Sequence, residues 1–187
     1  MPDALTSRWN MVDSQVRTAD VTDLRLIEAM RATPREAFLP ESQKALAYLD
    51  RDIALDGEDN VYLIKPMVLG RLLQAADIEP TDRVLVTGGA AGYAAALAGR
   101  LGAEVVAVCA NDKVAAASRS ALEASGLSNI TVTAGEAGQG DAAGGLTTSS
   151  CSMARPRWFR RPSMTRSSPA DASSACSRNL CPRAPPS

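Results

Sequence analysis

The chain has 187 residues, with 20 Lys and Arg against 21 Asp and Glu, and its net charge is −1 at pH 7. This length suffices for one domain with a buried core. The sequence contains no histidine, which excludes Ser-His-Asp and Cys-His nucleophile chemistry and most zinc sites. The four cysteines have no C-x-x-C spacing, and no apolar run approaches the length of about 18 residues that a membrane span needs. We therefore expect a cytoplasmic protein with reduced thiols and no membrane contact.

The first 80 residues are expected to form a helical segment that packs on the rest of the domain. Thr22 or Asp23 can cap a helix whose apolar residues recur at helical spacing. Pro66 suits the first turn of another helix, which runs to about Ala76. Further stretches of this segment are helical residues 11–16 and 43–49, an acidic loop at 56–60 and a brief apolar run at 61–64.

Residues 83–134 alternate between short β-branched runs and longer helical patterns. The expected order is strand 83–87, glycine turn 88–92, helix 93–101, strand 104–109, helix 112–125 and strand 129–134. Strands that alternate with helices in this way predict parallel βαβ units with right-handed crossovers. The sequence therefore predicts an α/β domain whose cofactor-binding half spans residues 81–140.

The glycine turn directly follows the first of these strands. Gly88 and Gly92 give the spacing G-x-x-x-G, which is neither the dinucleotide fingerprint G-x-G-x-x-G nor a Walker loop. A glycine turn between a strand and a helix lets a ligand approach backbone N–H groups and the helix N-terminus. The same spacing also serves tight strand–helix packing without a ligand, so both interpretations stay open at this point.

Three stretches of the sequence resemble the protein-L-isoaspartate O-methyltransferase family. Residues 34–40, PREAFLP, are similar to its P-R-x-x-F-[VL]-P. Residues 47–50, AYLD, with PMV at 66–68, are similar to its A-Y-x-D … Q-P-x-M-V. Residues 83–97, from RVL through G-x-x-x-G-Y into an Ala-rich helix, are similar to its cofactor loop. The resemblance implies a Rossmann-like sheet, S-adenosylmethionine as cofactor, and methyl transfer to the carboxylate of isoaspartyl residues in damaged proteins.

The resemblance also assigns cofactor contacts, but it assigns no catalytic residue and no metal. The residues expected to contact the cofactor are Gly88, Gly89, Ala90, Gly92, Cys109 and Glu136. Glu136 stands where the family often has an acid near the adenine. A solvated loop charge is the alternative interpretation of that residue.

This sequence departs from the family at three polar positions. Val86 stands two residues before the first glycine, where an acid is usual. Cys109 ends the second strand, where another acid usually accepts hydrogen bonds from the ribose hydroxyls, which a thiol does poorly. Asn111 or Asp112 can substitute from slightly later in the chain. Ile64 replaces a Ser or Thr of the segment that lies at the family's reaction centre.

The last part of the chain has a different composition. Residues 146–187 contain ten Ser, seven Arg, six Pro and one acid, and they have no sustained apolar period. Reading the codons of 147–178 one base earlier permits strand, helix, Lys-Pro-Gly-Gly turn and strand, so we interpret residues 141–187 as an out-of-frame, disordered tail. A nucleic-acid tail is disfavoured because the stretch has no Lys and no interleaved aromatics. The sheet is then truncated after its third strand, and its first strand has an unpaired edge.

Three hypotheses for function follow. The first is methyl transfer from S-adenosylmethionine to isoaspartyl-containing proteins or peptides, which needs no strong base and therefore no histidine. The second is a non-catalytic, methyltransferase-like binding protein, because three polar groups of the family are replaced. The third is an inactive frame-shifted product. None of them involves nucleic acid or a membrane.

Overall fold

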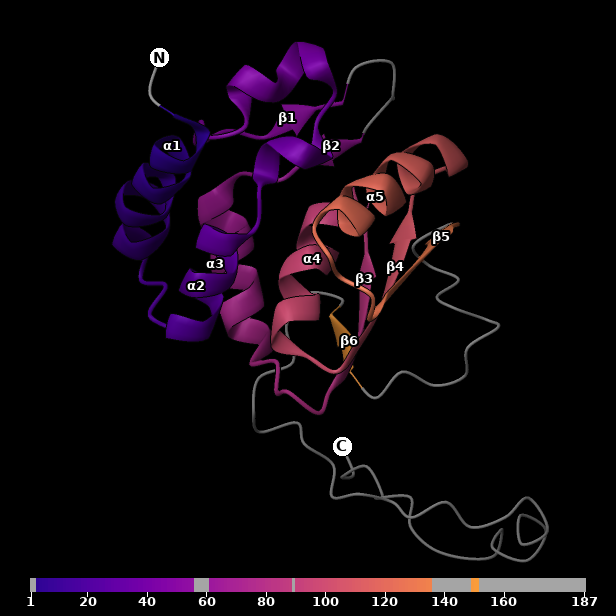
Figure 1. Ribbon diagram of the computed structural model, residues 1–187. Coiled ribbons are helices and arrows are strands. Elements are labelled where there is room, and N and C mark those ends of the chain that lie inside the picture. Colours follow the sequence, from indigo (N-terminus) through magenta and orange to yellow (C-terminus); the bar gives the residue numbers. More distant parts are fainter. Residues whose placement is uncertain (1–2, 56–60, 89, 136–148, 152–187) are drawn as a thin grey trace, which may run out of the picture. The chain divides into compact units, whose positions relative to one another are not determined.

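The computed structural model describes residues 3–55, 61–88, 90–135 and 149–151 (Figure 1). All of these residues fall within one compact unit. The boundaries expected at residues 80 and 140 remain predictions. No helix in the described ranges is long and apolar enough to cross a membrane.

A parallel sheet forms the centre of this unit. It contains β3 (Arg83–Thr87), β4 (Glu104–Cys109), β5 (Ile130–Ala134) and β6 (Ser149–Cys151), in the order β5-β4-β3-β6. In the register, Leu85 lies beside Val106, and Val106 lies beside Thr131. The three strands expected from the β-branched runs are thus confirmed, as is the parallel α/β architecture.

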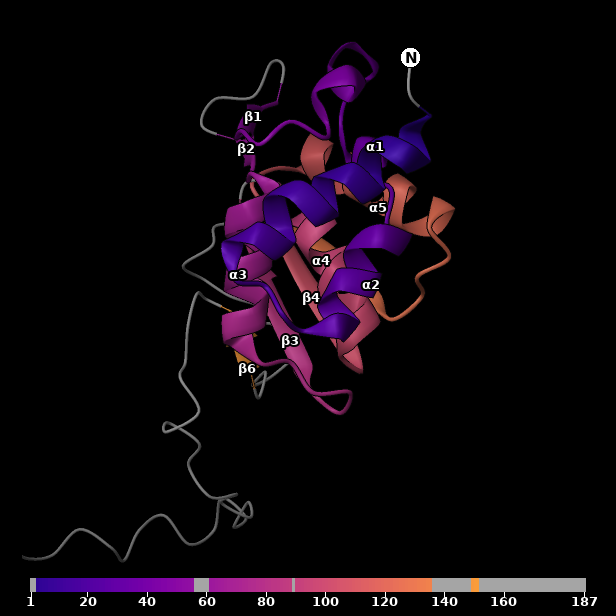
Figure 2. The same cartoon turned by 90° about the vertical axis from the view of Figure 1, so that its left-hand side faces the viewer.

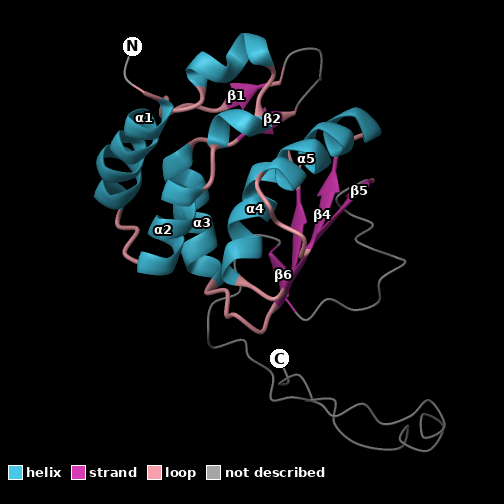
Figure 3. Cartoon of the chain, viewed as in Figure 1, coloured by secondary structure: helices cyan, strands magenta, loops and turns pink. Residues whose placement is uncertain are grey.

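Two helices cover one face of the sheet (Figure 3). They are α4 (Ala91–Leu101), between β3 and β4, and α5 (Asp112–Ala124), between β4 and β5. Asn111 caps α5 as expected, because its Oδ1 accepts the backbone N–H of Val114 at 2.9 Å. Small residues on α4 allow close packing, and Ala95, Ala96 and Ala98 are fully buried.

The N-terminal segment supplies the rest of the covering layer. Figure 2 shows its helices in front of β3 and β4. Its elements are α1 (Ala4–Met11), a π-helical stretch (Val12–Val16), α2 (Leu24–Ala32), α3 (Pro66–Ala76), the 3-10 turns Arg17–Ala19, Arg35–Phe38 and Glu41–Leu46, and the short hairpin of β1 (Ile53–Ala54) and β2 (Tyr62–Leu63). Asp23 caps α2 and Pro66 opens α3, as the sequence predicts. The hairpin was not expected, because its two strands pair across the loop between them and each strand has only two residues.

The expectation that β3 has an unpaired edge is wrong over three residues. Ser149–Cys151 form β6, which pairs in parallel with Val84–Val86. An exposed strand edge offers backbone N–H and C=O groups to any extended segment, whatever its side chains. Side-chain pattern therefore did not reveal this strand. The rest of the proposed out-of-frame tail lies outside the described residues.

Gly92 is the point of closest approach between α4 and its neighbours. A Cβ at this position would lie 2.5 Å from Ser118 Oγ, 2.8 Å from Ser118 Cβ and 3.1 Å from Phe38 Cδ1. We expect Gly92→Ala to lower the free energy of unfolding by about 1–3 kcal/mol, because the added methyl group overpacks this contact. Urea unfolding measures the change. Gly135→Ala is the control, since its Cβ would make an ordinary 3.6 Å contact with Val108; equal costs at the two sites would contradict this account of Gly92.

Candidate cofactor site

The turn after β3 places open space beside the backbone. Gly88 has φ +156°, a conformation that L side chains rarely adopt, and a Cβ there would meet no atom of the described residues within 4 Å. Its N–H donates to the carbonyl oxygen of Val108 at 3.3 Å, which ties the turn to β4. No side chain caps the N-terminus of α4 at Ala90. The uncapped N-terminus of α4 is therefore the feature of this turn that a ligand could approach, and contact with a cofactor here stays a prediction. Gly89 lies outside the described residues.

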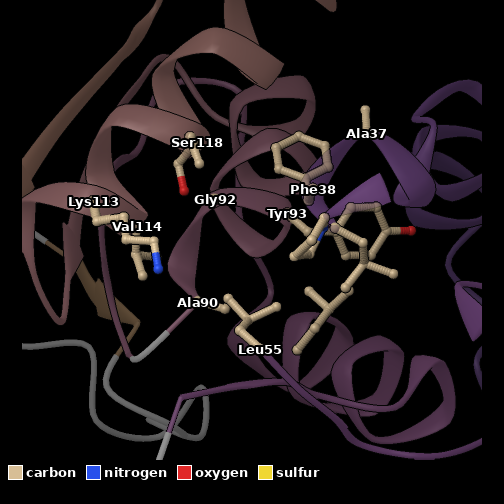
Figure 4. A pocket seen from close by; sticks show the side chains of 13 residues that line it. Ala37, Phe38, Leu55, Ala90, Gly92, Tyr93, Lys113, Val114 and Ser118 are labelled. Carbon is tan, nitrogen blue, oxygen red and sulfur yellow. The ribbon is translucent and has the colours of Figure 1, made fainter. Parts of the chain in front are cut away.

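Two cavities adjoin at Ala90. The larger has a volume of about 250 Å³ and is mostly apolar; it is lined by residues of the 3-10 turn Arg35–Phe38, of α4 and of α5 (Figure 4). Its wall consists of Ala37, Phe38, Leu39, Pro40, Leu55, Leu63, Ala90, Gly92, Tyr93, Lys113, Val114, Ala117 and Ser118. The smaller, of about 60 Å³, lies against the Gly88 turn and includes Ile64 and Val86 in its lining.

Cys109 lies at the carboxyl end of β4, as expected, but its thiol faces the interior. The residue is fully buried, and Sγ lies 3.7 Å from Ser118 Oγ on α5. Burial raises the pKa of the thiol, against smaller lowering effects from the Ser118 hydroxyl and the Ala91 backbone N–H. Cys109 does not line either cavity described above. Its assignment as a cofactor contact therefore stays a prediction without support from this placement.

We expect the Cys109 thiol to react slowly with iodoacetamide in the folded protein. Burial keeps the reagent out, and the raised pKa reduces the fraction of reactive thiolate. Mass spectrometry of the peptide that contains residue 109 should show alkylation at least about tenfold slower than in denaturant. Equal rates in the two conditions would show that the thiol is accessible in the fold.

The other residues singled out from the sequence have different surroundings in the structure. The Oδ1 of Asn111 is engaged in the cap of α5, whereas Asp112 is exposed in the first turn of the same helix. Ile64 and Val86 line the smaller cavity. The resemblance leads us to expect a hydroxyl and an acid at these two positions. Glu136 lies outside the described residues. In the described part of the chain, no group of three His, Cys, Asp or Glu could hold a metal ion.

Sequence reasoning did not assign a role to Arg35 and Tyr93. Both are fully buried, and the Arg35 Cζ lies 5.0 Å from the centroid of the Tyr93 ring. Phe38 packs edge-on against the same ring, with centroids 5.6 Å apart. The signal for Arg35 in the sequence was its place in the motif PREAFLP, directly after Pro34.

A second polar cluster lies among the N-terminal elements. The Tyr48 hydroxyl donates a hydrogen bond to Glu36, and Arg8 donates to both residues, at 3.2 Å to Tyr48 Oη and 3.3 Å to Glu36 Oε1. Burial and the Glu36 carboxylate raise the pKa of the Tyr48 hydroxyl. This cluster joins α1 to the 3-10 turn Arg35–Phe38 and to the residues that follow the turn Glu41–Leu46. It involves none of the residues that line the larger cavity.

Comparison with known protein families shows which family this chain belongs to. The family model described as protein-L-isoaspartate(D-aspartate) O-methyltransferase matches residues 7–144. The chain belongs to this family. The match covers both the N-terminal segment and the βαβαβ half of the sheet, in agreement with the resemblance carried by PREAFLP, AYLD and the glycine turn.

Curated members of the protein-L-isoaspartate O-methyltransferase family align with most of this chain. The enzyme of Methylorubrum extorquens is 33% identical over 144 residues, which are 76% of this chain and 62% of the relative. That of Koribacter versatilis is 35% identical over 133 residues, 71% of this chain and 59% of the relative. The chain therefore spans about 60% of the length of these relatives.

Solved structures agree on the fold. A protein-L-isoaspartate O-methyltransferase superposes with a TM-score of 0.61 at 25% identity, over 74% of this chain and 44% of that one. A putative member from Plasmodium falciparum, solved in complex with S-adenosyl-L-homocysteine, gives a TM-score of 0.54 at 12% identity, over 67% of this chain and 62% of that one. The described part of this chain thus has the architecture of this methyltransferase fold.

Proposed function

We propose that this chain binds S-adenosylmethionine at the Gly88 turn and transfers its methyl group to the carboxylate of isoaspartyl residues in proteins or peptides. The observation that carries the proposal is the open space at Gly88, which lies at the carboxyl end of a parallel strand and beside an uncapped helix N-terminus. Membership of the family supports the substrate class. A cytoplasmic location is proposed with it.

The residues present fit the cofactor in part. The N-terminus of α4 at Ala90, next to the open turn at Gly88, suits the carboxylate of the methionine portion. The large apolar cavity on the other side of Ala90 can take a ring system. Asp112 is the exposed carboxylate nearest in sequence to the end of β4, and we assign it the ribose hydroxyls in place of Cys109. Gly89, Gly92 and Glu136 remain proposed contacts.

The chemistry asks little acid–base work of the protein. When bound, the cofactor would supply an electrophilic methyl group on a sulfonium, which a carboxylate oxygen could accept with a neutral thioether as the leaving group. No proton has to be removed, because the acceptor is already ionised at neutral pH. The task of this chain is to exclude water and to align the acceptor with the methyl group. Leu63 and Ile64, which line the smaller cavity beside Gly88, are placed to do so.

Transfer of labelled methyl groups from S-adenosylmethionine to an isoaspartyl peptide tests the proposal. We expect base-labile methyl ester on the isoaspartyl peptide and none on the same peptide with ordinary aspartate. Binding of S-adenosylhomocysteine without any transfer would overturn the enzymatic part and favour the non-catalytic alternative. The apolar Ile64 beside the Gly88 turn is the observation that favours that alternative.

We further propose that the reading frame changes near residue 144. The family match ends at this position, and the composition changes over the following residues. Sequencing the coding DNA through codons 138–150, together with the mass of the purified protein, decides the question. A frame that continues unchanged from the relatives' equivalent codons would contradict the proposal.

A further inference from the structure

Arg35 is a fully buried cation that has no carboxylate partner within ion-pair distance in the described part of the chain. Burial lowers its pKa, against the favourable influence of Tyr93, Tyr48 and Asp52. A buried charge without an ion-pair partner is costly, and an apolar side chain of similar volume would often pack at lower cost. Stabilisation of the fold therefore does not explain why an arginine is buried here, and its contacts indicate another role.

Those contacts join three segments that are distant in the sequence. Nε donates to the carbonyl oxygen of Ala47 at 2.8 Å, and Nη2 donates to the carbonyl oxygen of Ile64 at 2.7 Å. The guanidinium carbon Cζ lies over the Tyr93 ring, 5.0 Å from its centroid. A planar fork of fixed geometry can hold two carbonyl groups and stack on an aromatic ring at once, whereas an ammonium cannot.

The segment that Arg35 holds forms a wall shared by both cavities. Leu63 lines the larger and the smaller cavity, and Ile64 lines the smaller one. Residues 52–55 also hold this segment, through the two residue pairs of the β1–β2 hairpin, the N–H of Leu55, which donates to the Val61 carbonyl oxygen at 2.9 Å, and the N–H of Lys65, which donates to Asp52 Oδ1 at 2.8 Å. Tyr93, on the other side of the guanidinium, lines the larger cavity.

We propose that Arg35 is a positioning residue, whose guanidinium holds the carbonyl of Ile64 and the ring of Tyr93 in register and so fixes the wall of the cofactor site opposite the Gly88 turn. The inference rests on the proposed function for its link to the cofactor. The link between Arg35 and the segment 61–65 does not depend on it.

The test compares Arg35→Lys and Arg35→Met with two controls. Arg25→Lys makes the same chemical change at an exposed arginine, which donates to the Ile78 carbonyl at 3.2 Å. Leu26→Ala removes a fully buried side chain of α2 that lines neither cavity. It serves as a control for the loss of folding stability that the Arg35 variants are expected to show. The readouts are amide hydrogen exchange over residues 61–69 and over 105–109, and the dissociation constant of S-adenosylhomocysteine well below each melting temperature.

We expect Arg35→Lys to speed amide exchange over 61–69 by about tenfold and to leave exchange over 105–109 unchanged. We also expect it to weaken S-adenosylhomocysteine binding by at least about tenfold, because hydrogen bonds from a charged donor are lost. Both control variants should bind as the wild type does. Arg35→Lys carries the test if Arg35→Met does not fold. The inference would be overturned if Arg35→Lys bound S-adenosylhomocysteine as the wild type does and showed unchanged exchange over 61–69. It would also be overturned if Leu26→Ala weakened binding as much as Arg35→Lys does. If the wild type binds no S-adenosylhomocysteine, the proposed function fails, and the exchange data alone decide whether Arg35 holds the segment.

Discussion

Tyr93→Ala is expected to lower the free energy of unfolding by about 3–5 kcal/mol, as truncations of buried aromatic residues do. Tyr93 is fully buried, Phe38 packs on its ring, and the Arg35 guanidinium lies over its face. The truncation removes the ring that Phe38 and Arg35 contact, and it leaves a cavity between α4 and the N-terminal segment. Urea unfolding followed by circular dichroism measures the loss.

Tyr93→Phe is the matched control, because it keeps the ring and removes only the hydroxyl. We expect a change within about 1 kcal/mol. A cost for Tyr93→Ala no larger than that for Tyr93→Phe would show that the ring does not hold the two segments together.

The difference in stability between the wild type and Tyr93→Phe should depend on pH. Burial raises the pKa of Tyr93 from 10.0 to about 12. The unfolded chain therefore releases this proton at lower pH than the folded protein does, so the contribution to stability is complete below pH 10 and is lost as the pH rises towards about 12. Wild-type stability should fall relative to Tyr93→Phe across this range, and parallel curves for the two proteins would contradict the burial of an ionisable hydroxyl.

Gly88→Val is expected to abolish measurable S-adenosylhomocysteine binding, a loss of at least about a hundredfold in affinity, equivalent to nearly 3 kcal/mol. The side chain would occupy the open space beside the turn and strain a backbone with φ +156°. Isothermal calorimetry gives the affinity, and thermal unfolding reports the cost of the strain separately.

Gly126→Val controls for that strain. Gly126 ends α5 with φ +69°, and a Cβ there also meets no atom within 4 Å. Gly126 lines neither cavity. Gly126→Val should therefore lose stability but bind S-adenosylhomocysteine as the wild type does. Wild-type binding by Gly88→Val would place the cofactor elsewhere.

Local chemistry made much of the fold predictable from the sequence. The β-branched runs gave β3 and β4, Asn111 gave the start of α5, and Pro66 gave the start of α3. These features depend on a few neighbouring residues, so a pattern reveals them. The β1–β2 hairpin has only two residues in each strand, and β6 depends on backbone pairing with a distant strand, so neither carries a side-chain signal in the sequence.

The site was predictable only where backbone conformation determines it. The G-x-x-x-G spacing indicated Gly88 correctly as a turn of special geometry. At Gly92, which the same spacing assigns either to a ligand contact or to tight packing, the structure shows close packing against Ser118 and Phe38, and the residue also lines the larger cavity. The direction of the Cys109 side chain and the contacts of Arg35 depend on tertiary packing, which no local pattern in this sequence encodes.

Titration of the full chain with S-adenosylhomocysteine tests the central claim most directly. If residues 81–135 retain the cofactor-binding half of the methyltransferase, calorimetry should show saturable binding of one molecule per chain, and Gly88→Val should eliminate it. Absence of binding at millimolar ligand, in a protein whose unfolding transition is cooperative, would contradict the claim that this half-sheet still holds a cofactor.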